Sequence, residues 1–229
     1  MKTAIITGST GNLGKAVAHK FIKEGYRVVG TVTHKDDATT EFPTDSFEGV
    51  AVDVENEEDA KNFVEKTFSK YGAIDVAVIT VGGFAKGTVA ETKTTEIINQ
   101  YRLNFETAYN IAQPVFVQMM QQGNGRIFLI GSRPGIDAKY SKGMVAYGLA
   151  KSLIFRLAEL MNDEAKGHNV VTSVVVPSTI DTEVNRTFMP EADFNSWVKA
   201  EEIAGTIYFY CTDAAAALRE PVIKAYNNS

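Results

Sequence analysis

Residues 3–21 read TAIITGSTGNLGKAVAHKF, and this stretch decides the fold. A short β-branched run (3–7) leads into three glycines, and an amphipathic helical pattern begins where they end. Gly8, Gly11 and Gly14 allow a tight turn, a close approach of the backbone to a pyrophosphate, and close packing of helix on strand. The helix N-terminus then offers free N–H groups and a positive dipole end to phosphate. The unit predicts dinucleotide binding, although its spacing is GxxGxxG rather than GxGxxG and an ordinary glycine-rich turn is the alternative.

Strand and helix patterns alternate along the rest of the chain. The candidate strands, nearly continuous in Val and Ile as in parallel sheets buried on both faces, cover residues 3–7, 27–33, 49–53, 74–80, 126–132, 169–176 and 221–226. The candidate helices cover residues 13–24, 56–71, 94–121, 143–165 and 200–212. No linker or repeat interrupts the pattern, so we expect one domain over residues 1–229. The fold class is α/β, a Rossmann-type doubly wound parallel sheet of about seven strands with helices on both faces, in three layers.

Bulk properties exclude several functional classes. The net charge is −5 without a basic block, so neither a nucleic-acid partner nor an anionic membrane surface is expected. No apolar run is long enough to span a membrane, and no secretion signal follows Met1, so a cytoplasmic location is expected. The single cysteine, Cys211, lies in an apolar stretch and is expected to be a buried structural thiol. The three histidines (His19, His34 and His168) have no metal-ligand spacing, so no metal site is expected and a metal-dependent hydrolase is disfavoured.

The glycine turn resembles that of a known family, the short-chain dehydrogenases/reductases, and the resemblance covers nearly the whole chain. TGSTGNLG (7–14) is similar to the family's opening TGxxxGxG motif, with Asn12 in place of the middle glycine. VITVGG (78–83) occupies the place of the family's NNAG, of which only Gly82 is kept. Asp53 matches the aspartate that in the family bonds the adenine ring. The resemblance thus implies a cofactor site formed here by Gly8, Ser9, Thr10, Gly11, Asn12, Leu13, Gly14, Asp53, Val54, Val81, Gly82 and Gly83.

The end of the second predicted strand bears on the choice between NAD and NADP. An acidic side chain there holds the ribose 2′-hydroxyl of NAD, whereas a basic one accommodates the 2′-phosphate of NADP. In this chain the acidic position falls at Val32, and the aspartates at 36–37 lie slightly late. His34 and Lys35 could meet the phosphate, or this could be only a solvated charged loop. The sequence favours NADP(H), with NAD(H) as the alternative.

The stretch MVAYGLAK (144–151) places Tyr147 and Lys151 one helical turn apart on the same face. A free tyrosine has a pKa near 10, and a nearby ammonium favours the phenolate, which brings the phenol closer to the working range of an acid–base catalyst. A chance YxxxK pair is the alternative. In the family the matching tyrosine donates a proton to the substrate oxygen, and the lysine also holds the nicotinamide ribose.

Two further residues match the family's catalytic set. Ser132 ends the fifth predicted strand and matches the serine that orients the substrate oxygen; its separation from Tyr147 is slightly longer than usual, and a turn or cap residue is the alternative. Asn104 matches the helix asparagine that holds a water beside the lysine, with a buried structural amide as the alternative. The resemblance therefore implies that Ser132, Tyr147, Lys151 and Asn104 are the catalytic residues.

VVPSTIDT (175–182) is similar to the family's PGxxxT motif, with Ser178 in place of glycine. This implies that the nicotinamide is lined by Pro177, Ser178, Thr179, Ile180 and Thr182. A short lid is expected at about 182–199. Residues 181–197, with GGF at 82–84, also resemble dihydropteridine reductases, so Trp197 and Phe194 could stack on a flat ring or could simply pack within the lid.

The resulting expectation is an NAD(P)(H)-dependent oxidoreductase acting on a small carbonyl or alcohol. Reduction of a quinonoid pterin and a non-catalytic dinucleotide sensor remain as alternatives. From the family resemblance, a homodimer or homotetramer that pairs through the helices at 94–121 and 143–165 is also expected.

Overall fold

The structure is a computed structural model that describes residues 1–33, 42–43 and 45–228. The seven strands are β1 (Thr3–Thr7), β2 (Arg27–Val32), β3 (Phe47–Ala51), β4 (Val76–Ile79), β5 (Asn124–Ile130), β6 (Asn169–Pro177) and β7 (Val222–Ala225). The α-helices are α1 (Asn12–Lys23), α2 (Glu57–Tyr71), α3 (Thr94–Tyr101), α4 (Thr107–Gln122), α5 (Arg133–Ile136), α6 (Val145–Glu164), α7 (Glu183–Phe188) and α8 (Ala200–Phe209). Shorter helical turns are η2 (Arg102–Glu106), η3 (Ala138–Tyr140), η4 (Phe194–Ser196) and η5 (Asp213–Ala215).

The strands form one sheet in the order β3-β2-β1-β4-β5-β6-β7, and every neighbouring pair is parallel. The order reverses direction at β1, which pairs with β2 on one side and with β4 on the other. All carboxyl ends of the strands lie along one edge, and the crevice beside β1 is where ligands bind in open sheets of this kind. The Rossmann-type prediction is confirmed.

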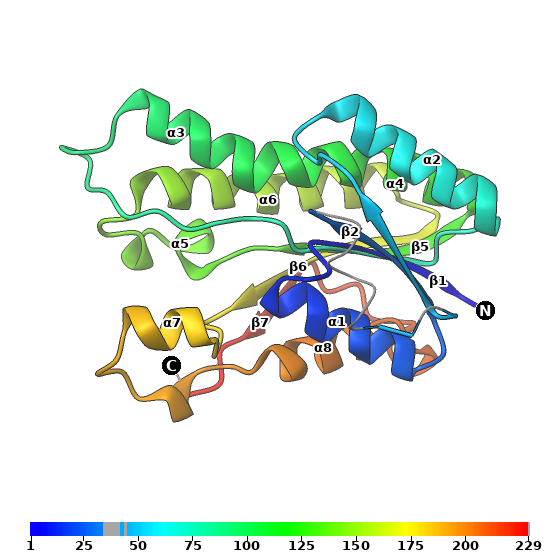
Figure 1. Ribbon diagram of the computed structural model, residues 1–229. Helices are drawn as coiled ribbons and strands as arrows, with labels where there is room; N and C mark the ends of the chain where they lie inside the picture. Colours follow the sequence, from blue (N-terminus) through cyan, green and yellow to red (C-terminus); the bar gives the residue numbers. More distant parts are fainter. Residues whose placement is uncertain (34–41, 44, 229) are drawn as a thin grey trace.

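Helices cover both faces of the sheet (Figure 1). On one face α1 packs against α8, with Phe21 and Ile203 buried against the sheet. On the other face α2, α4 and α6 pack over a second apolar core that includes Ile111 and Ile154. Strands buried between two such layers can present apolar side chains on both sides, and all five residues of β1 are buried.

The predicted helix over 94–121 is interrupted, because Arg102–Glu106 is a π-helical turn between α3 and α4. The sequence pattern did not predict this turn. The prediction also missed the short helices α5 and α7, which are stabilised by local caps at Ser132 and Thr182. Within the described part of the chain, no helix has the length and apolar character needed to cross a membrane.

Candidate active site

The turn after β1 is bound to the end of β2. Gly8 adopts φ +59°, and its carbonyl accepts a 2.9 Å hydrogen bond from the Gly11 amide. The Gly8 amide donates to Thr31 Oγ1 at 2.9 Å, and the Ser9 amide donates to the Thr31 carbonyl at 3.1 Å. A Cβ atom at Gly14 would overlap the Gly8 carbonyl, so position 14, in the first turn of α1, accepts only glycine. Sequence analysis missed Thr31, for which the sequence carries no signal beyond its place at the end of a strand.

The first turn of α1 presents backbone amides at the carboxyl edge of the sheet. Its N-cap is Gly11, and among the described residues no side chain caps the turn. The amides of Asn12, Leu13 and Gly14 therefore keep the donor capacity and dipole that a phosphate would use. Ser9 is buried, with Oγ bonded to Thr31, whereas Thr10 and Leu13 are half-buried.

Threonines tie the ends of β1 and β4 together in place of the missing NNAG asparagine. Thr7 Oγ1 accepts from the amides of Thr80 at 2.9 Å and Val81 at 3.3 Å. Thr80 Oγ1 in turn donates to the Thr7 carbonyl. The loss of the motif's asparagine therefore leaves the strand junction hydrogen-bonded by another route.

The predicted adenosine side of the site is only partly described. Val32 is buried, and His34 and Lys35 lie outside the described residues. Asp53 is exposed beyond β3, where its Oδ1 accepts from the Glu55 amide at 3.0 Å. The Val54 carbonyl accepts from Asn110 Nδ2 at 3.1 Å, which ties this loop to α4.

Tyr147 and Lys151 lie one turn apart on α6, and Ser132 lies at the end of β5, where its Oγ caps α5. The Ser132 side chain lies close enough to the Tyr147 hydroxyl to act on its pKa. Burial raises the pKa of Tyr147, and Ser132 acts in the opposite direction. Ser132 therefore caps α5, as the alternative interpretation expected, and its role in orienting a substrate oxygen stays a prediction.

Lys151 is buried beneath Tyr147, and its Nζ donates to the Ile130 carbonyl at 2.9 Å. Burial lowers the pKa of Lys151 from 10.5 to about 8, because the ammonium is removed from water. The side chain therefore reaches the carboxyl end of β5 from inside the protein.

Asn104 lies in the π-helical turn and is fully buried. Its Oδ1 accepts from the Gly83 amide at 3.1 Å, and its Nδ2 donates to Gln100 Oε1 at 3.0 Å. A Cβ added at Gly82 would lie 2.8 Å from Asn104 Oδ1 and 3.3 Å from Lys151 Nζ. Asn104, Gly82 and Lys151 thus meet at one point. Gln100 was missed, although a polar side chain four residues before Asn104 is the available signal.

The segment after β6 forms a hydrogen-bonded strap and then α7. Ser178 Oγ donates to the Tyr226 carbonyl at 2.8 Å, which fixes the strap to the end of β7. The Thr179 carbonyl accepts from the Val198 amide at 3.1 Å, the Ile180 carbonyl accepts from an asparagine of α7, and Thr182 caps that helix. Pro177 is the last residue of β6.

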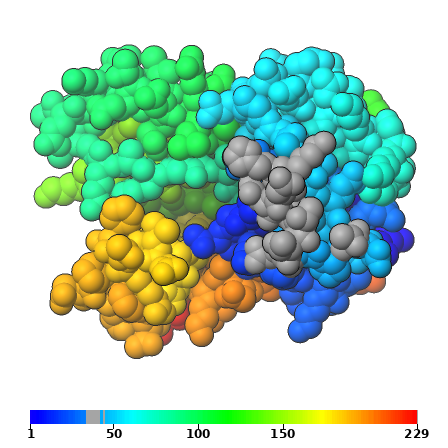
Figure 2. Space-filling model, in the orientation of Figure 1, coloured from blue at the N-terminus to red at the C-terminus, as the bar shows by residue number. Residues whose placement is uncertain are grey.

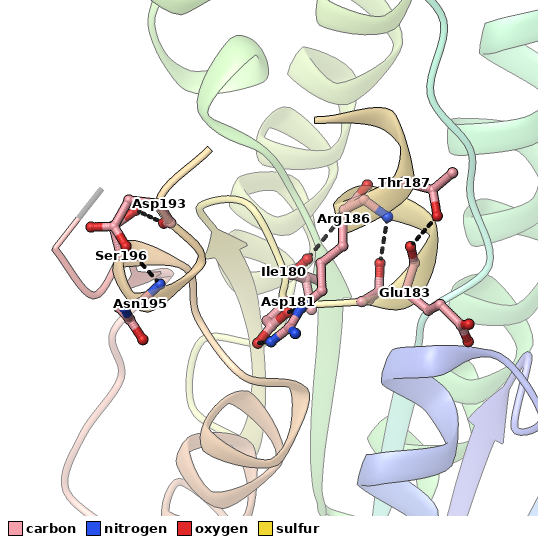
Figure 3. Close-up of polar contacts among 10 residues, drawn as sticks. Ile180, Asp181, Glu183, Arg186, Thr187, Asp193, Asn195 and Ser196 are labelled. Atoms are coloured by element: carbon pink, nitrogen blue, oxygen red, sulfur yellow. Dashed lines mark hydrogen bonds and ion pairs between the residues drawn. The ribbon is translucent and has the colours of Figure 1, made fainter. Parts of the chain in front are cut away.

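Figure 3 shows how α7 and the following turn are held. Asp181 accepts two bonds from Arg186, at 2.6 and 2.8 Å, and the guanidinium also lies 4.8 Å from the centre of the Phe194 ring. Trp197 is 5% exposed and packs at 4.8 Å from Phe194. The two rings therefore pack within the lid. Trp197 has no open face for stacking on a ligand. Its burial therefore gives no support to the dihydropteridine-reductase alternative.

Cys211 is half-buried, and its Sγ donates to the Ile207 carbonyl at 3.4 Å. Burial raises the pKa of this thiol to about 12, which keeps it protonated. These observations favour the predicted structural thiol over a nucleophile.

The arrangement combines a glycine turn at a helix N-terminus with two neighbouring hydroxyls and a buried lysine, and comparisons with known proteins identify its family. The family model described as short chain dehydrogenase matches residues 2–193. The chain belongs to the short-chain dehydrogenase family. It is therefore an oxidoreductase, and members of this family use NAD(P)(H) and act on small molecules.

Relatives within the short-chain dehydrogenase family span almost the full chain. An uncharacterized oxidoreductase, YvrD of Bacillus subtilis, is 29% identical over 95% of this chain and 92% of its own length. The 3-oxoacyl-[acyl-carrier-protein] reductase FabG of Escherichia coli is 24% identical over 94% of this chain and 91% of its own. Among solved structures, the aldohexose dehydrogenase of Thermoplasma acidophilum is 22% identical with a TM-score of 0.84, covering 97% of this chain and 91% of its own. At that identity the structural likeness supports the fold alone.

Proposed function

We propose that this enzyme is an NAD(P)(H)-dependent oxidoreductase that transfers hydride between nicotinamide and a small carbonyl or alcohol, with Tyr147 as the proton donor or acceptor. The observation that carries the proposal is the grouping of Tyr147 beside Ser132 with a buried Lys151 one helical turn along α6, whose Nζ donates to the Ile130 carbonyl. Burial, the largest effect, raises the Tyr147 pKa, and Ser132 lowers it, so the lowering by Lys151 that the sequence predicts is part of this proposal.

The cofactor fits the residues at the carboxyl edge of the sheet. The uncapped first turn of α1 would hold the pyrophosphate, and Gly82, Val81 and the strap from Pro177 to Thr182 would border the nicotinamide. The closeness of Gly82 to Lys151 Nζ would let the lysine reach the ribose hydroxyls. When bound, the nicotinamide supplies or accepts the hydride.

The protein's own groups would manage the proton and the substrate oxygen. In the reductive direction, Ser132 Oγ would donate a hydrogen bond to the carbonyl oxygen, and Tyr147 would give its phenolic proton to the same oxygen. The positive end of Lys151 favours the phenolate left behind. Asn104 would keep Gly82 and Gly83 in place beside the lysine, and it would hold a water that relays protons to solvent, as the family resemblance implies.

NADP(H) is the proposed cofactor. Val32, buried at the end of β2, supplies no carboxylate for a ribose 2′-hydroxyl. Titration with NADPH and NADH, read by intrinsic fluorescence and thermal shift, tests this choice. Tighter binding of NADPH is expected, and a preference for NADH would overturn it. If neither dinucleotide binds, the proposed cofactor site is wrong.

Replacement of Tyr147 by Phe tests the catalytic proposal. Turnover of a carbonyl substrate should fall by a factor of about 10²–10⁴, while NADPH binding is retained. Tyr109→Phe on α4, with a 43% exposed side chain, is the matched control and should keep full activity. Cofactor binding with no turnover of a broad panel of carbonyls by the unmodified protein would favour the non-catalytic sensor.

We further propose that residues 1–229 act as one domain with an integral substrate site, covered by the short lid at 182–199. Oligomer formation through α3, α4 and α6 is supported by large apolar side chains that remain exposed on these helices. They are Ile98, Tyr101, Tyr109, Val117, Leu149, Leu153 and Leu160.

A further inference from the structure

Phe84 is an exposed aromatic residue in direct contact with the proposed proton donor. Its ring centre lies 5.1 Å from that of Tyr147, at an interplanar angle of 78°, and the side chain is 56% exposed. One side of the ring thus packs edge-on against the reacting tyrosine, and the rest faces solvent. A single exposed apolar ring is ordinary on a protein surface, and what distinguishes Phe84 is its contact with the proposed proton donor.

The position of Phe84 is fixed on both sides by hydrogen bonds. Before it, the Gly83 amide donates to Asn104 Oδ1, which the buried Gln100 holds in orientation. After it, the Gly87 amide donates to the Gly143 carbonyl at 2.8 Å, and the Gly87 carbonyl accepts from the amide of Val145, the first residue of α6, at 3.1 Å. The loop that carries the ring is therefore attached to the same helix as Tyr147, and the ring is pre-positioned for binding.

A second apolar surface lies on α7. Val184 and Phe188 are four residues apart, hence on one face of this helix, and are 55% and 79% exposed; Met189 follows at 38%. The nearby Arg186 is engaged by Asp181. Figure 2 shows the surface hollowed between the segment that follows β4 and α7, with the glycine turn at one end of the hollow.

We propose that Phe84 is a specificity-determining residue and that the substrate is an aryl carbonyl compound, or the corresponding aryl alcohol, whose flat ring stacks on Phe84 while its oxygen meets Tyr147 and Ser132. The inference rests on the proposed function and deepens it by naming the substrate class. A stacked or edge-to-face aromatic pair is worth more than its buried area alone, whereas a puckered ring of similar size gains only the area.

Two matched ketones test this proposal: acetophenone and cyclohexyl methyl ketone, which differ in the flatness of the ring. Their dissociation constants are measured by ligand-detected NMR on the unmodified chain, alone and with NADP⁺, and on Phe84→Leu and Phe84→Tyr. The unmodified chain and Phe84→Tyr should bind acetophenone more tightly, by about three- to tenfold. Phe84→Leu should lose this preference, and Phe209→Leu, on an exposed position of α8, should keep it.

Equal binding of the two ketones by the unmodified chain, or a preference retained by Phe84→Leu, would overturn the inference. Unchanged melting temperatures of the variants would exclude a folding defect. Initial rates with the same ketones separate the two proposals. An aryl preference in binding that depends on Phe84, with no turnover of these ketones or of the broad carbonyl panel, supports Phe84 as the residue that binds the flat ring and overturns the proposed reaction, whereas turnover without any dependence on Phe84 does the reverse.

Discussion

Gln100 in α3 holds Asn104, which lies one helical turn later in the π-helical turn η2: Nδ2 of Asn104 donates to Oε1 of Gln100 at 3.0 Å, and both side chains are buried. The opposite end of the Asn104 amide accepts from the Gly83 backbone. Asn104 Nδ2 also donates to the Gln100 backbone carbonyl at 3.3 Å, and because an amide has a donor end and an acceptor end, these two acceptors turn the Asn104 oxygen toward the loop. Gln100 is therefore a positioning residue for the candidate site, acting through Asn104.

Replacing Gln100 by Leu should leave Asn104 Nδ2 without its side-chain acceptor in a buried place. We expect a loss of about 1–3 kcal/mol in the free energy of unfolding and a lower kcat, with little change in NADPH affinity. Urea denaturation and steady-state kinetics measure these effects. The control is Gln121→Leu near the exposed end of α4, which should change neither. Normal kcat in Gln100→Leu would show that the pair is not needed for positioning.

Gly82→Ala should damage the site directly. The new methyl group would lie 2.8 Å from Asn104 Oδ1 and 3.3 Å from Lys151 Nζ, so one of them must move. We expect a cost of about 1–3 kcal/mol in stability and a marked loss of turnover. Gly205→Ala in α8 is the matched control, because a Cβ there meets nothing within 4 Å. That variant should be as stable as the native protein or more so. Full activity in Gly82→Ala would refute the close packing.

Lys151 should make the free energy of unfolding of the protein depend on pH. Its folded pKa of about 8 lies below the ordinary value of 10.5, so between these values the unfolded chain binds more protons. The free energy of unfolding therefore rises with pH from this group, by about 3 kcal/mol between pH 7 and pH 10.5. The gain is absent below pH 8 and complete above 10.5.

Urea denaturation of the native protein and of Lys151→Met at several pH values measures this contribution as a difference, in which other titrating groups cancel. The native protein should gain stability relative to the variant as the pH rises. An exposed-lysine variant, Lys61→Met, should run parallel to the native protein. Parallel curves for Lys151→Met would contradict the lowered pKa.

The exposed leucines on α6 provide a test of assembly. Leu149 and Leu153 are four residues apart and 52% and 38% exposed. Changing both to Glu should raise the dissociation constant of an oligomer at least about a hundredfold, because a paired apolar surface would have to bury two charges. Size-exclusion chromatography with light scattering reports the change. Val89→Glu, at an 83% exposed loop position, should leave the assembly intact. A native protein that is monomeric at micromolar concentration would disprove the proposal.

The sequence alone predicted the strand–turn–helix unit at 3–21, the parallel sheet, and the placement of Tyr147 and Lys151 one turn apart on a helix. These features depend on local spacing: a period in apolar residues, a glycine where the backbone must turn, and two side chains one turn apart. Each of these patterns involves residues close together in the sequence, and the structure contains the predicted elements.

Other features required the tertiary structure. The bond from Thr31 to the glycine turn, the meeting of Asn104 with Gly82 and Lys151, and the contact of Phe84 with Tyr147 each join segments far apart in the chain. Sequence spacing says nothing about such distances, because they depend on how parallel strands bring their carboxyl ends to one edge. Burial likewise exists only after packing, which is why the lowered pKa of Lys151 and the enclosed Trp197 belong to the folded protein and not to the sequence pattern.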